Sequence, residues 1–221
     1  MNIAQLEKRD LILFDLDGTL VDSAADLHHA MNLSLSQLNL ETISLQQVRE
    51  WIGKGSAIFC QSVLQHLTQK VDELQQQKLL ATFLAYYNAE PCVKSHLFLG
   101  VLEFLNWAKE HQKTMVCVTN KPEQPAREIL NQLKIIDYFD DVIGGDRFTE
   151  RKPHPKPLLY CLEHYQMNAQ QTLMIGDSSN DVEAARRAGI DCIVVSYGYN
   201  HGEPIANCQP QQIVDNLTEL L

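Results

Sequence analysis

Residues 11–19 read LILFDLDGT, an apolar run that ends in two aspartates, a glycine and a threonine. The four apolar residues before the first aspartate are continuous rather than alternating, which is typical of a strand that helices cover on both faces. Asp15 and Asp17 follow this strand directly. The stretch therefore predicts a buried parallel strand that brings two carboxylates to one edge of a sheet.

Further apolar runs have the same character; they span residues 115–118, 173–175, 192–195 and, more weakly, 141–143. Helical patterns of apolar residues separate these runs along the chain. Strands that alternate with helices are typical of a doubly wound, Rossmann-like α/β sheet. We therefore expect a parallel sheet of this kind as the core of the protein.

The first two of these strands are separated by about a hundred residues, most of which have helical character. One apolar stripe in this interval consists of Leu27, Met31, Leu35 and Leu38. A second stretch, residues 71–89, contains neither proline nor glycine. We therefore expect an inserted all-helical cap over residues 21–90, and an α/β catalytic core formed by residues 1–20 and 91–221.

The composition excludes several classes of protein. A chain of 221 residues with 45% hydrophobic side chains can bury a full core, and no apolar run approaches the roughly 20 residues that span a bilayer. A net charge of −10 argues against nucleic acid or an anionic membrane as a general partner. We expect a soluble protein with a small-molecule partner, and the sequence leaves open whether it is a monomer or a homodimer.

Two features of the sequence predict a cytoplasmic location. The first ten residues, MNIAQLEKRD, lack the apolar stretch of a secretory signal. The six cysteines are scattered without any C-x-x-C pair, and two of them, Cys117 and Cys192, lie inside apolar runs. We therefore expect reduced thiols and no zinc site.

The two carboxylates after the first strand suit phosphoryl transfer. Asp15 can attack phosphorus and form an aspartyl phosphate, and Asp17 can protonate the leaving oxygen and later deprotonate water. Gly18 lets the backbone turn sharply and present amide donors to phosphate oxygens. The structural alternative is an acidic turn that only caps a helix. Four of the five residues at 15–19 match a D-x-D-G-T pattern, which rarely arises by chance and favours the functional interpretation.

Two further elements can bind a phosphoryl group. Thr119 and Asn120 directly follow a predicted strand, where the threonine hydroxyl can donate a hydrogen bond; the alternative is a helix cap before a proline. Lys152 lies in a proline-rich loop and can neutralise charge on the phosphoryl oxygens. Lys156 is the competing lysine of that loop, and His154 is expected to be structural.

Another acidic element follows a predicted strand later in the chain. Mg²⁺ prefers a few carboxylates, a carbonyl and waters in octahedral geometry, and Asp177 at a strand end suits such a ligand. Asp181 can face the metal or brace Lys152. Asp15, Thr119 and Asp177 all fall just past the carboxyl ends of predicted parallel strands, the edge at which open α/β sheets bind ligands. This shared placement predicts a single site.

These motifs resemble those of the haloacid dehalogenase superfamily and, within it, those of the bacterial phosphoglycolate phosphatases. The resemblance covers essentially the whole chain and is carried by DLDGTLVDSAADL at 15–27, VREWIGKG at 48–55, VTNKP at 118–122, IGGDRF at 143–148, KPHPKPLL at 152–159, GDSSNDVEAARRAG at 176–189 and YGYNHGEPI at 197–205. One departure is Leu99 before Gly100, where the family usually has proline.

The resemblance implies a magnesium-dependent phosphatase that acts on a small phosphate monoester, with 2-phosphoglycolate as the first candidate. It implies Asp15 as the nucleophile and Asp17 as the acid/base. Thr119 and Lys152 are implied to bind the phosphoryl group. The metal is implied to be held by Asp15, Asp177 and the backbone carbonyl of Asp17.

Other functions share parts of this pattern. A phosphosugar phosphatase or mutase has the same motifs. A haloacid dehalogenase also attacks with an aspartate, but it needs neither a metal nor the general acid that Asp17 provides. A signalling receiver domain combines an acceptor aspartate, a threonine and a lysine on a doubly wound sheet, without the D-x-D-G-T pattern and without a cap.

Substrate choice is predicted to lie in the cap segment 48–55. Gly53 and Gly55 on either side of Lys54 allow close backbone approach, and the amides that open a helix at Ser56 can form an anion site. Arg49 can bind a substrate carboxylate or brace the loop through a salt bridge. The sequence leaves these two roles of Arg49 open.

Overall fold

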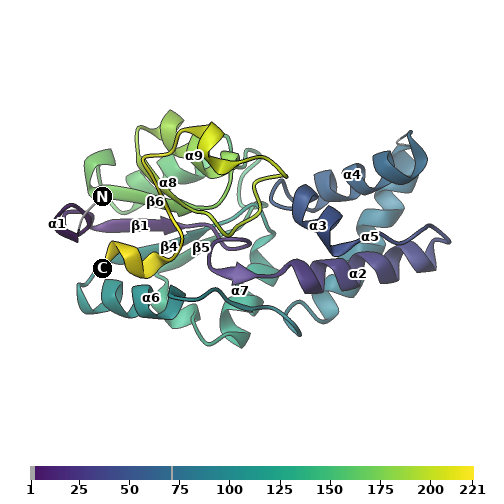
Figure 1. Cartoon of the computed structure of the whole chain (residues 1–221), viewed down its shortest axis with the longest axis horizontal. Coiled ribbons are helices and arrows are strands. Elements are labelled where there is room, and N and C mark those ends of the chain that lie inside the picture. Colours follow the sequence, from purple (N-terminus) through teal and green to yellow (C-terminus); the bar gives the residue numbers. More distant parts are fainter. Residues whose placement is uncertain (1–2, 71) are drawn as a thin grey trace.

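The computed structural model describes residues 3–70 and 72–221. Its core is a six-stranded sheet in which neighbouring strands are parallel, in the order β5-β4-β1-β6-β7-β8 (Figure 1). The strands are β1 (Leu11–Phe14), β4 (Thr114–Val118), β5 (Asp141–Ile143), β6 (Thr172–Gly176), β7 (Asp191–Val195) and β8 (Gln212–Val214). The chain builds from β1 to one edge and then to the other, so the predicted doubly wound α/β fold is confirmed.

Helices cover both faces of the sheet. Alternate residues of β1 point to opposite faces, and because all of them are apolar, both faces need to be covered. Ile12 and Phe14 belong to the apolar cluster that includes α6 and α7, whereas Leu11 and Leu13 belong to the cluster that includes α8 and α9. The helices are α1 (Ile3–Leu6), α6 (Val101–Glu110), α7 (Glu123–Gln132), α8 (Lys156–His164) and α9 (Ser179–Ala188). All four residues of β1 are thereby fully buried, which explains why their sequence does not alternate.

Four helices lie beyond the carboxyl ends of the strands (Figure 1); they are α2 (Ala24–Gln37), α3 (Leu45–Trp51), α4 (Ser56–Thr68) and α5 (Glu73–Ala89). The stripe predicted on α2 faces the interior, since Leu27, Met31 and Leu35 are buried. Asp72 caps α5, so this helix begins slightly later than predicted, and Val71 lies outside the described residues. The division into a cap at 21–90 and a core stays a prediction.

The segment predicted to be all-helical does not begin with a helix. Its first residues form β2 (Val21–Asp22), which pairs antiparallel with β3 (His96–Leu97), because the two connections between the sheet and the four helices run side by side. The buried carboxylate of Asp26 ties these connections together by accepting hydrogen bonds from the backbone N–H groups of Val93, Lys94 and Ser95.

The predicted strands are all present, and each extends by at most one residue at either end. β8 was not predicted; it has three residues, pairs with β7 at the sheet edge and buries only its last side chain. Short 3₁₀ helices complete the fold: η1 (Ile136–Tyr138), η2 (Ala169–Gln171), η3 (Ile205–Cys208) and η4 (Leu217–Leu220). Within the described residues, every helix is too short or too polar to cross a membrane.

Candidate active site

Three neighbouring strands end at one edge of the sheet, and a polar residue directly follows each of them. Asp15 follows β1, Thr119 follows β4 and Asp177 follows β6. Because β1 lies between β4 and β6 and all three are parallel, these residues come to lie side by side. All three are buried. The structure therefore brings together the residues that the sequence predicted to converge.

Lys152 reaches the same edge from the loop before α8. Its Nζ lies 3.0 Å from Oδ1 of Asp15 and donates a hydrogen bond to Oδ1 of Asp181 at 2.7 Å. Burial alone would lower the pKa of Lys152, but the two carboxylates outweigh burial and raise it. Asp181 thus braces Lys152, which is one of the two roles that the sequence left open. Its other oxygen accepts from the backbone N–H of Ser178 and caps α9.

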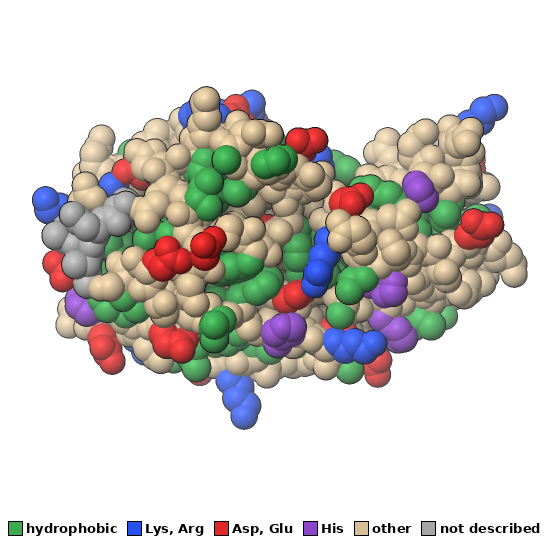
Figure 2. Space-filling view, viewed as in Figure 1, with side chains coloured by type: hydrophobic (Ala, Val, Ile, Leu, Met, Phe, Trp, Pro, Cys, Tyr) green, Lys and Arg blue, Asp and Glu red, His purple; other side chains and the backbone are tan. Residues whose placement is uncertain are grey.

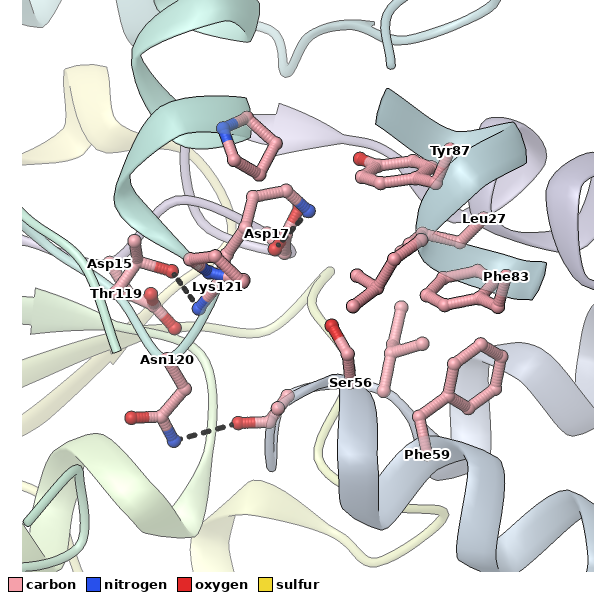
Figure 3. Close-up of a pocket in the computed structure, with 16 residues that line it drawn as sticks. Asp15, Asp17, Leu27, Ser56, Phe59, Phe83, Tyr87, Thr119, Asn120 and Lys121 are labelled. Atoms are coloured by element: carbon pink, nitrogen blue, oxygen red, sulfur yellow. Dashed lines mark hydrogen bonds and ion pairs between the residues drawn. The ribbon is translucent and has the colours of Figure 1, made fainter. Parts of the chain in front are cut away.

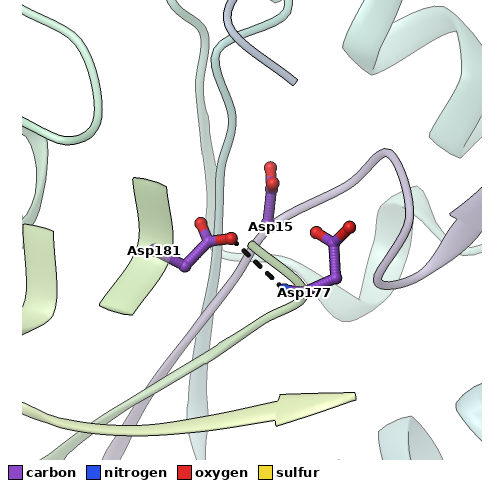
Figure 4. A group of neighbouring side chains, drawn as sticks. All are labelled: Asp15, Asp177 and Asp181. Atoms are coloured by element: carbon purple, nitrogen blue, oxygen red, sulfur yellow. Dashed lines mark hydrogen bonds between the residues drawn. The ribbon is translucent and has the colours of Figure 1, made fainter. Parts of the chain in front are cut away.

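Asp15, Asp177 and Asp181 form a buried acidic cluster (Figure 4), in which one carboxylate oxygen from each lies within 4.8 Å of the others. Burial raises the pKa of Asp15 to about 6, with Lys152 opposing the shift and Asp181 adding to it. Burial, Asp181 and Asp15 likewise raise the pKa of Asp177. The cluster therefore holds more negative charge than the protein neutralises, and it can bind a metal cation that relieves this repulsion.

The carboxylate of Asp177 is held in a fixed orientation. The hydroxyl of Thr19 donates to one oxygen at 3.1 Å and the backbone N–H of Tyr199 to the other at 2.6 Å. Gly18 has a φ of +89°, and a Cβ there would lie 2.2 Å from Oδ2 of Asp177, so both conformation and space require glycine. Its N–H donates to the carbonyl of Val21 at 2.9 Å. This amide therefore closes the turn, and the presentation of backbone amides to phosphate by the turn at Gly18 stays a prediction.

Asp17 has partners that the sequence did not indicate. Its two carboxylate oxygens accept hydrogen bonds from Nζ of Lys121 at 2.9 and 2.8 Å, and one also accepts from the hydroxyl of Ser23. Burial alone would lower the pKa of Lys121, but Asp17 outweighs burial and raises it. Lys121 is therefore a charged member of the site.

A cavity that is partly open to solvent lies between the strand ends and the helices α4 and α5 (Figure 3). Its core wall carries the polar residues Asp15, Asp17, Thr119, Asn120 and Lys121. Its opposite wall is mostly apolar and consists of Leu27, Ile52, Phe59, Phe83, Leu84 and Tyr87, with Ser56 as a polar exception. A phosphate ester in this cavity would meet the carboxylates on one side and an apolar surface on the other.

The loop before α4 is tied to the core by side-chain amides. The carbonyl of Gly53 accepts from Asn120 at 3.0 Å and from Asn180 at 3.2 Å. Asn120 also donates to the carbonyl of Lys152 at 2.9 Å. The side-chain amide of Asn120 therefore connects two loops, and the phosphate-binding role of this residue stays a prediction. Gly55 lines the cavity with a φ of +91°, as predicted for a close backbone approach.

Arg49 and Lys54 do not contribute to the cavity wall that the described residues form. Nη2 of Arg49 lies 3.1 Å from Oδ2 of Asp22, and the hydroxyl of Tyr199 donates to the other oxygen of that carboxylate. Lys54 is exposed. Of the two roles left open for Arg49, the structure contains the bracing salt bridge, and the part of segment 48–55 in substrate choice stays a prediction.

The roles of His154 and Lys156 can now be separated from that of Lys152. Both side chains are exposed. Nδ1 of His154 accepts a hydrogen bond from the backbone N–H of Lys156 at 3.2 Å, and Nζ of Lys156 lies 6.0 Å from the centre of the Phe148 ring. Lys152 is the lysine of this loop that reaches the carboxylates.

The chain is similar to known proteins over almost its whole length. The family model described as haloacid dehalogenase-like hydrolase matches residues 12–195. A phosphoglycolate phosphatase of Nitrosococcus oceani is 40% identical over 97% of this chain and 96% of that protein, and one of Colwellia psychrerythraea is 39% identical over 98% and 97%. The crystal structure of a predicted phosphoglycolate phosphatase from Haemophilus somnus matches with a TM-score of 0.92 and 34% identity, over 96% of each chain.

Proposed function

The chain belongs to the haloacid dehalogenase-like hydrolase family, and from this premise we propose that it is a magnesium-dependent phosphatase that hydrolyses 2-phosphoglycolate to glycolate and phosphate. The observation that carries the proposal is the buried contact of 3.0 Å between Asp15 and Lys152, at the floor of a cavity that Asp17 also lines. The similar phosphoglycolate phosphatases, aligned over nearly the whole chain, support the substrate.

The reaction has two steps. In the first, a carboxylate oxygen of Asp15 attacks phosphorus, the bond from phosphorus to the glycolate oxygen breaks, and Asp17 gives its proton to that oxygen. In the second, Asp17 takes a proton from a water molecule that attacks the aspartyl phosphate, which releases phosphate and restores Asp15. Lys152 neutralises charge on the phosphoryl oxygens, and the hydroxyl of Thr119 donates a hydrogen bond to one of them.

The acidic cluster fits a hard divalent cation. Asp15 and Asp177 are buried carboxylates with raised pKa values, and the cluster found among the described residues contains only oxygen ligands. A magnesium ion would be held by Asp15, Asp177 and the backbone carbonyl of Asp17. Its charge would stabilise the phosphoryl group during transfer.

The cavity also weighs against the alternative substrates. Sugar hydroxyls placed against the apolar wall of Phe59 and Phe83 would lose water without gaining hydrogen-bond partners, which is unfavourable. A dehalogenase has no use for a general acid at Asp17. A receiver domain has no helices that cover the acceptor aspartate, as α4 and α5 do here.

The purified protein is expected to release phosphate steadily from 2-phosphoglycolate in the presence of magnesium. Chelation should stop turnover, and added magnesium should restore it. A screen over sugar phosphates, nucleotides and pyrophosphate is expected to give the highest kcat/KM for phosphoglycolate. A higher value for a sugar phosphate would refute the substrate and leave the phosphatase standing, whereas full activity after exhaustive chelation would remove magnesium from the mechanism.

Magnesium affinity is expected to fall as the pH drops below about 6. The folded, metal-free protein holds a proton on Asp15 up to about pH 6, whereas an unperturbed aspartate releases it near 3.8. Protons and metal therefore compete for this carboxylate, and the apparent Kd should rise about tenfold for each pH unit below 6. Titration calorimetry between pH 5 and 8 measures this dependence. A Kd that stays constant over this range would contradict the assigned ligand.

The surface is consistent with a small-molecule partner. On the face shown in Figure 2, Lys and Arg side chains are scattered singly among acidic ones, and the chain has a net charge of −10. We therefore propose neither nucleic acid nor an anionic membrane as a partner. The six cysteines are free thiols, which fits the cytoplasmic location that we propose.

A further inference from the structure

The glycolate end of the proposed substrate needs a partner that is separate from the groups serving the phosphoryl end. A carboxylate that enters the cavity beside Asp15 and Asp17 adds negative charge to a partly apolar space, which is costly unless a cation lies within reach. Among the described residues that line the cavity, Lys121 is the only one with a positive charge. Lys152 lies beneath the phosphoryl position, where Asp15 and Asp181 already pair with it.

The ammonium of Lys121 lies at the right place for a two-carbon acid. Asp17 must reach the oxygen that joins phosphorus to glycolate, and Nζ of Lys121 lies 2.8 Å from Asp17. In 2-phosphoglycolate the carboxylate carbon is the second carbon from that oxygen. The ammonium of Lys121, which contacts Asp17, is therefore close to the substrate carboxylate. An ammonium has three N–H donors. Two of them point to the oxygens of Asp17, and the third is available to a substrate carboxylate placed beside the nearby hydroxyl of Tyr87.

Tyr87 provides a second donor on the opposite wall. This residue lies in the last turn of α5, is 2% exposed, and has a hydroxyl that forms no hydrogen bond of regular geometry with the described residues. Its nearest polar neighbour is the ammonium of Lys121, which opposes the rise of its pKa. Nζ of Lys121 lies 4.8 Å from the centre of its ring, and the hydroxyl points into the cavity towards Lys121 and Asp17 (Figure 3). Burial raises the pKa of Tyr87 to about 12, so the hydroxyl is a donor at neutral pH. A buried donor without a partner indicates a missing acceptor.

We propose that the hydroxyl of Tyr87 and the ammonium of Lys121 together bind the substrate carboxylate and select short phosphorylated acids over neutral phosphate esters. The inference rests on the proposed function and assigns substrate choice to α5 and the loop after β4, rather than to Arg49. The neighbouring Phe83 and Leu84 make this side of the cavity apolar, which strengthens the interaction of the pair with a charged group.

The test compares 2-phosphoglycolate with 2-hydroxyethyl phosphate, which has the same number of carbon atoms but an uncharged hydroxymethyl group in place of the carboxylate. The ratio of their kcat/KM values measures recognition of the carboxylate. Tyr87→Phe is expected to lower this ratio about tenfold, mainly through a higher KM for phosphoglycolate. The matched control is Tyr86→Phe, since Tyr86 is 37% exposed on the same helix, and its ratio should equal that of the wild type.

Lys121→Met is expected to lower the same ratio about a hundredfold, because the charge that faces the carboxylate is lost. Lys121→Arg keeps the charge and should restore part of the preference. A lysine that only positioned Asp17 would lower kcat for both esters by the same factor. An unchanged ratio in Lys121→Met together with an unchanged ratio in Tyr87→Phe would overturn the proposal.

The wild-type enzyme separates failure of this proposal from failure of the proposed function. Equal kcat/KM values of the wild type for both esters would refute phosphoglycolate as the preferred substrate, and the inference would fall with it. A wild type that prefers phosphoglycolate, with variants that keep the full preference, would leave the function standing and refute only the roles of Tyr87 and Lys121.

Discussion

Asp15→Asn is expected to abolish turnover, with a loss of at least about a thousandfold in kcat. The amide of asparagine carries no negative charge and cannot form an aspartyl phosphate, although its shape is close to that of the carboxylate. Lys152 keeps its partner Asp181 at 2.7 Å, so the neighbouring loop should stay in place. Steady-state release of phosphate from 2-phosphoglycolate with saturating magnesium measures the loss.

The same variant is expected to fold at least as well as the wild type. Burial raises the pKa of Asp15 to about 6, so at pH 7 the ionised carboxylate opposes folding of the metal-free protein. Asparagine removes that charge. The Tm of metal-free Asp15→Asn at pH 7 should therefore equal or exceed that of the wild type. The difference should shrink as the pH falls from 6 towards 3.8 and vanish below that value, where the aspartate is protonated in both the folded and the unfolded state.

Two further variants complete this experiment. Asp137→Asn changes an exposed aspartate in the same way and should keep wild-type turnover. Asp17→Asn should also be severely impaired, because the acid/base group is lost while the nucleophile remains. Turnover above a few per cent of the wild-type rate in Asp15→Asn would rule out a covalent mechanism through this residue.

The ends of the central strands are the part of the site that the sequence predicts well. Continuous apolar runs identify buried parallel strands, and parallel strands bring their carboxyl ends to one edge. Asp15, Thr119 and Asp177 therefore converge whatever the detail of side-chain packing. Lys152 is predicted for a related reason, since its proline-rich loop enters a helix beside the same edge.

Contacts between elements that dock on one another could not be predicted in this way. From the sequence, Arg49 could bind a substrate carboxylate or form a salt bridge. Only the folded arrangement of α3 and β2 shows that Asp22 is its partner. The ammonium of Lys121 donates a hydrogen bond to Asp17, a residue 104 positions earlier in the chain. Tyr87 has the sequence signal of an ordinary core aromatic, because its cavity exists only once α5 lies over the strand ends.

The shortest strands were missed for a physical reason as well. β2 has only two residues, and β8 buries only the last of its three side chains, whereas β5 buries two of three. Neither β2 nor β8 therefore shows the continuous apolar run that identifies a buried strand. Their stability comes from partners elsewhere in the chain: β7 for the first and β3 for the second. Local sequence preference therefore contributes little to either of them.

Lys152→Met is expected to damage both stability and turnover. The side chain is 2% exposed, and its removal leaves Asp15 and Asp181 buried without a compensating charge. Breaking one side of such a buried ion pair typically costs about 3–5 kcal/mol of the free energy of unfolding, and the loss of charge at the phosphoryl oxygens should lower kcat at least about a hundredfold. Urea unfolding and phosphate release measure the two effects.

The pH dependence and a matched lysine make this prediction specific. Without Lys152 the pKa of Asp15 rises further, so protonation of this carboxylate offsets more of the lost stability at pH 5 than at pH 8. The stability difference from the wild type should therefore be larger at pH 8. Lys156→Met changes an exposed lysine of the same loop and should leave unfolding and turnover unchanged. Equal losses of turnover in both variants would show that Lys152 has no special role at the phosphoryl group. Unfolding of Lys152→Met at the wild-type urea concentration would show that its contact with Asp15 and Asp181 does not stabilise the fold.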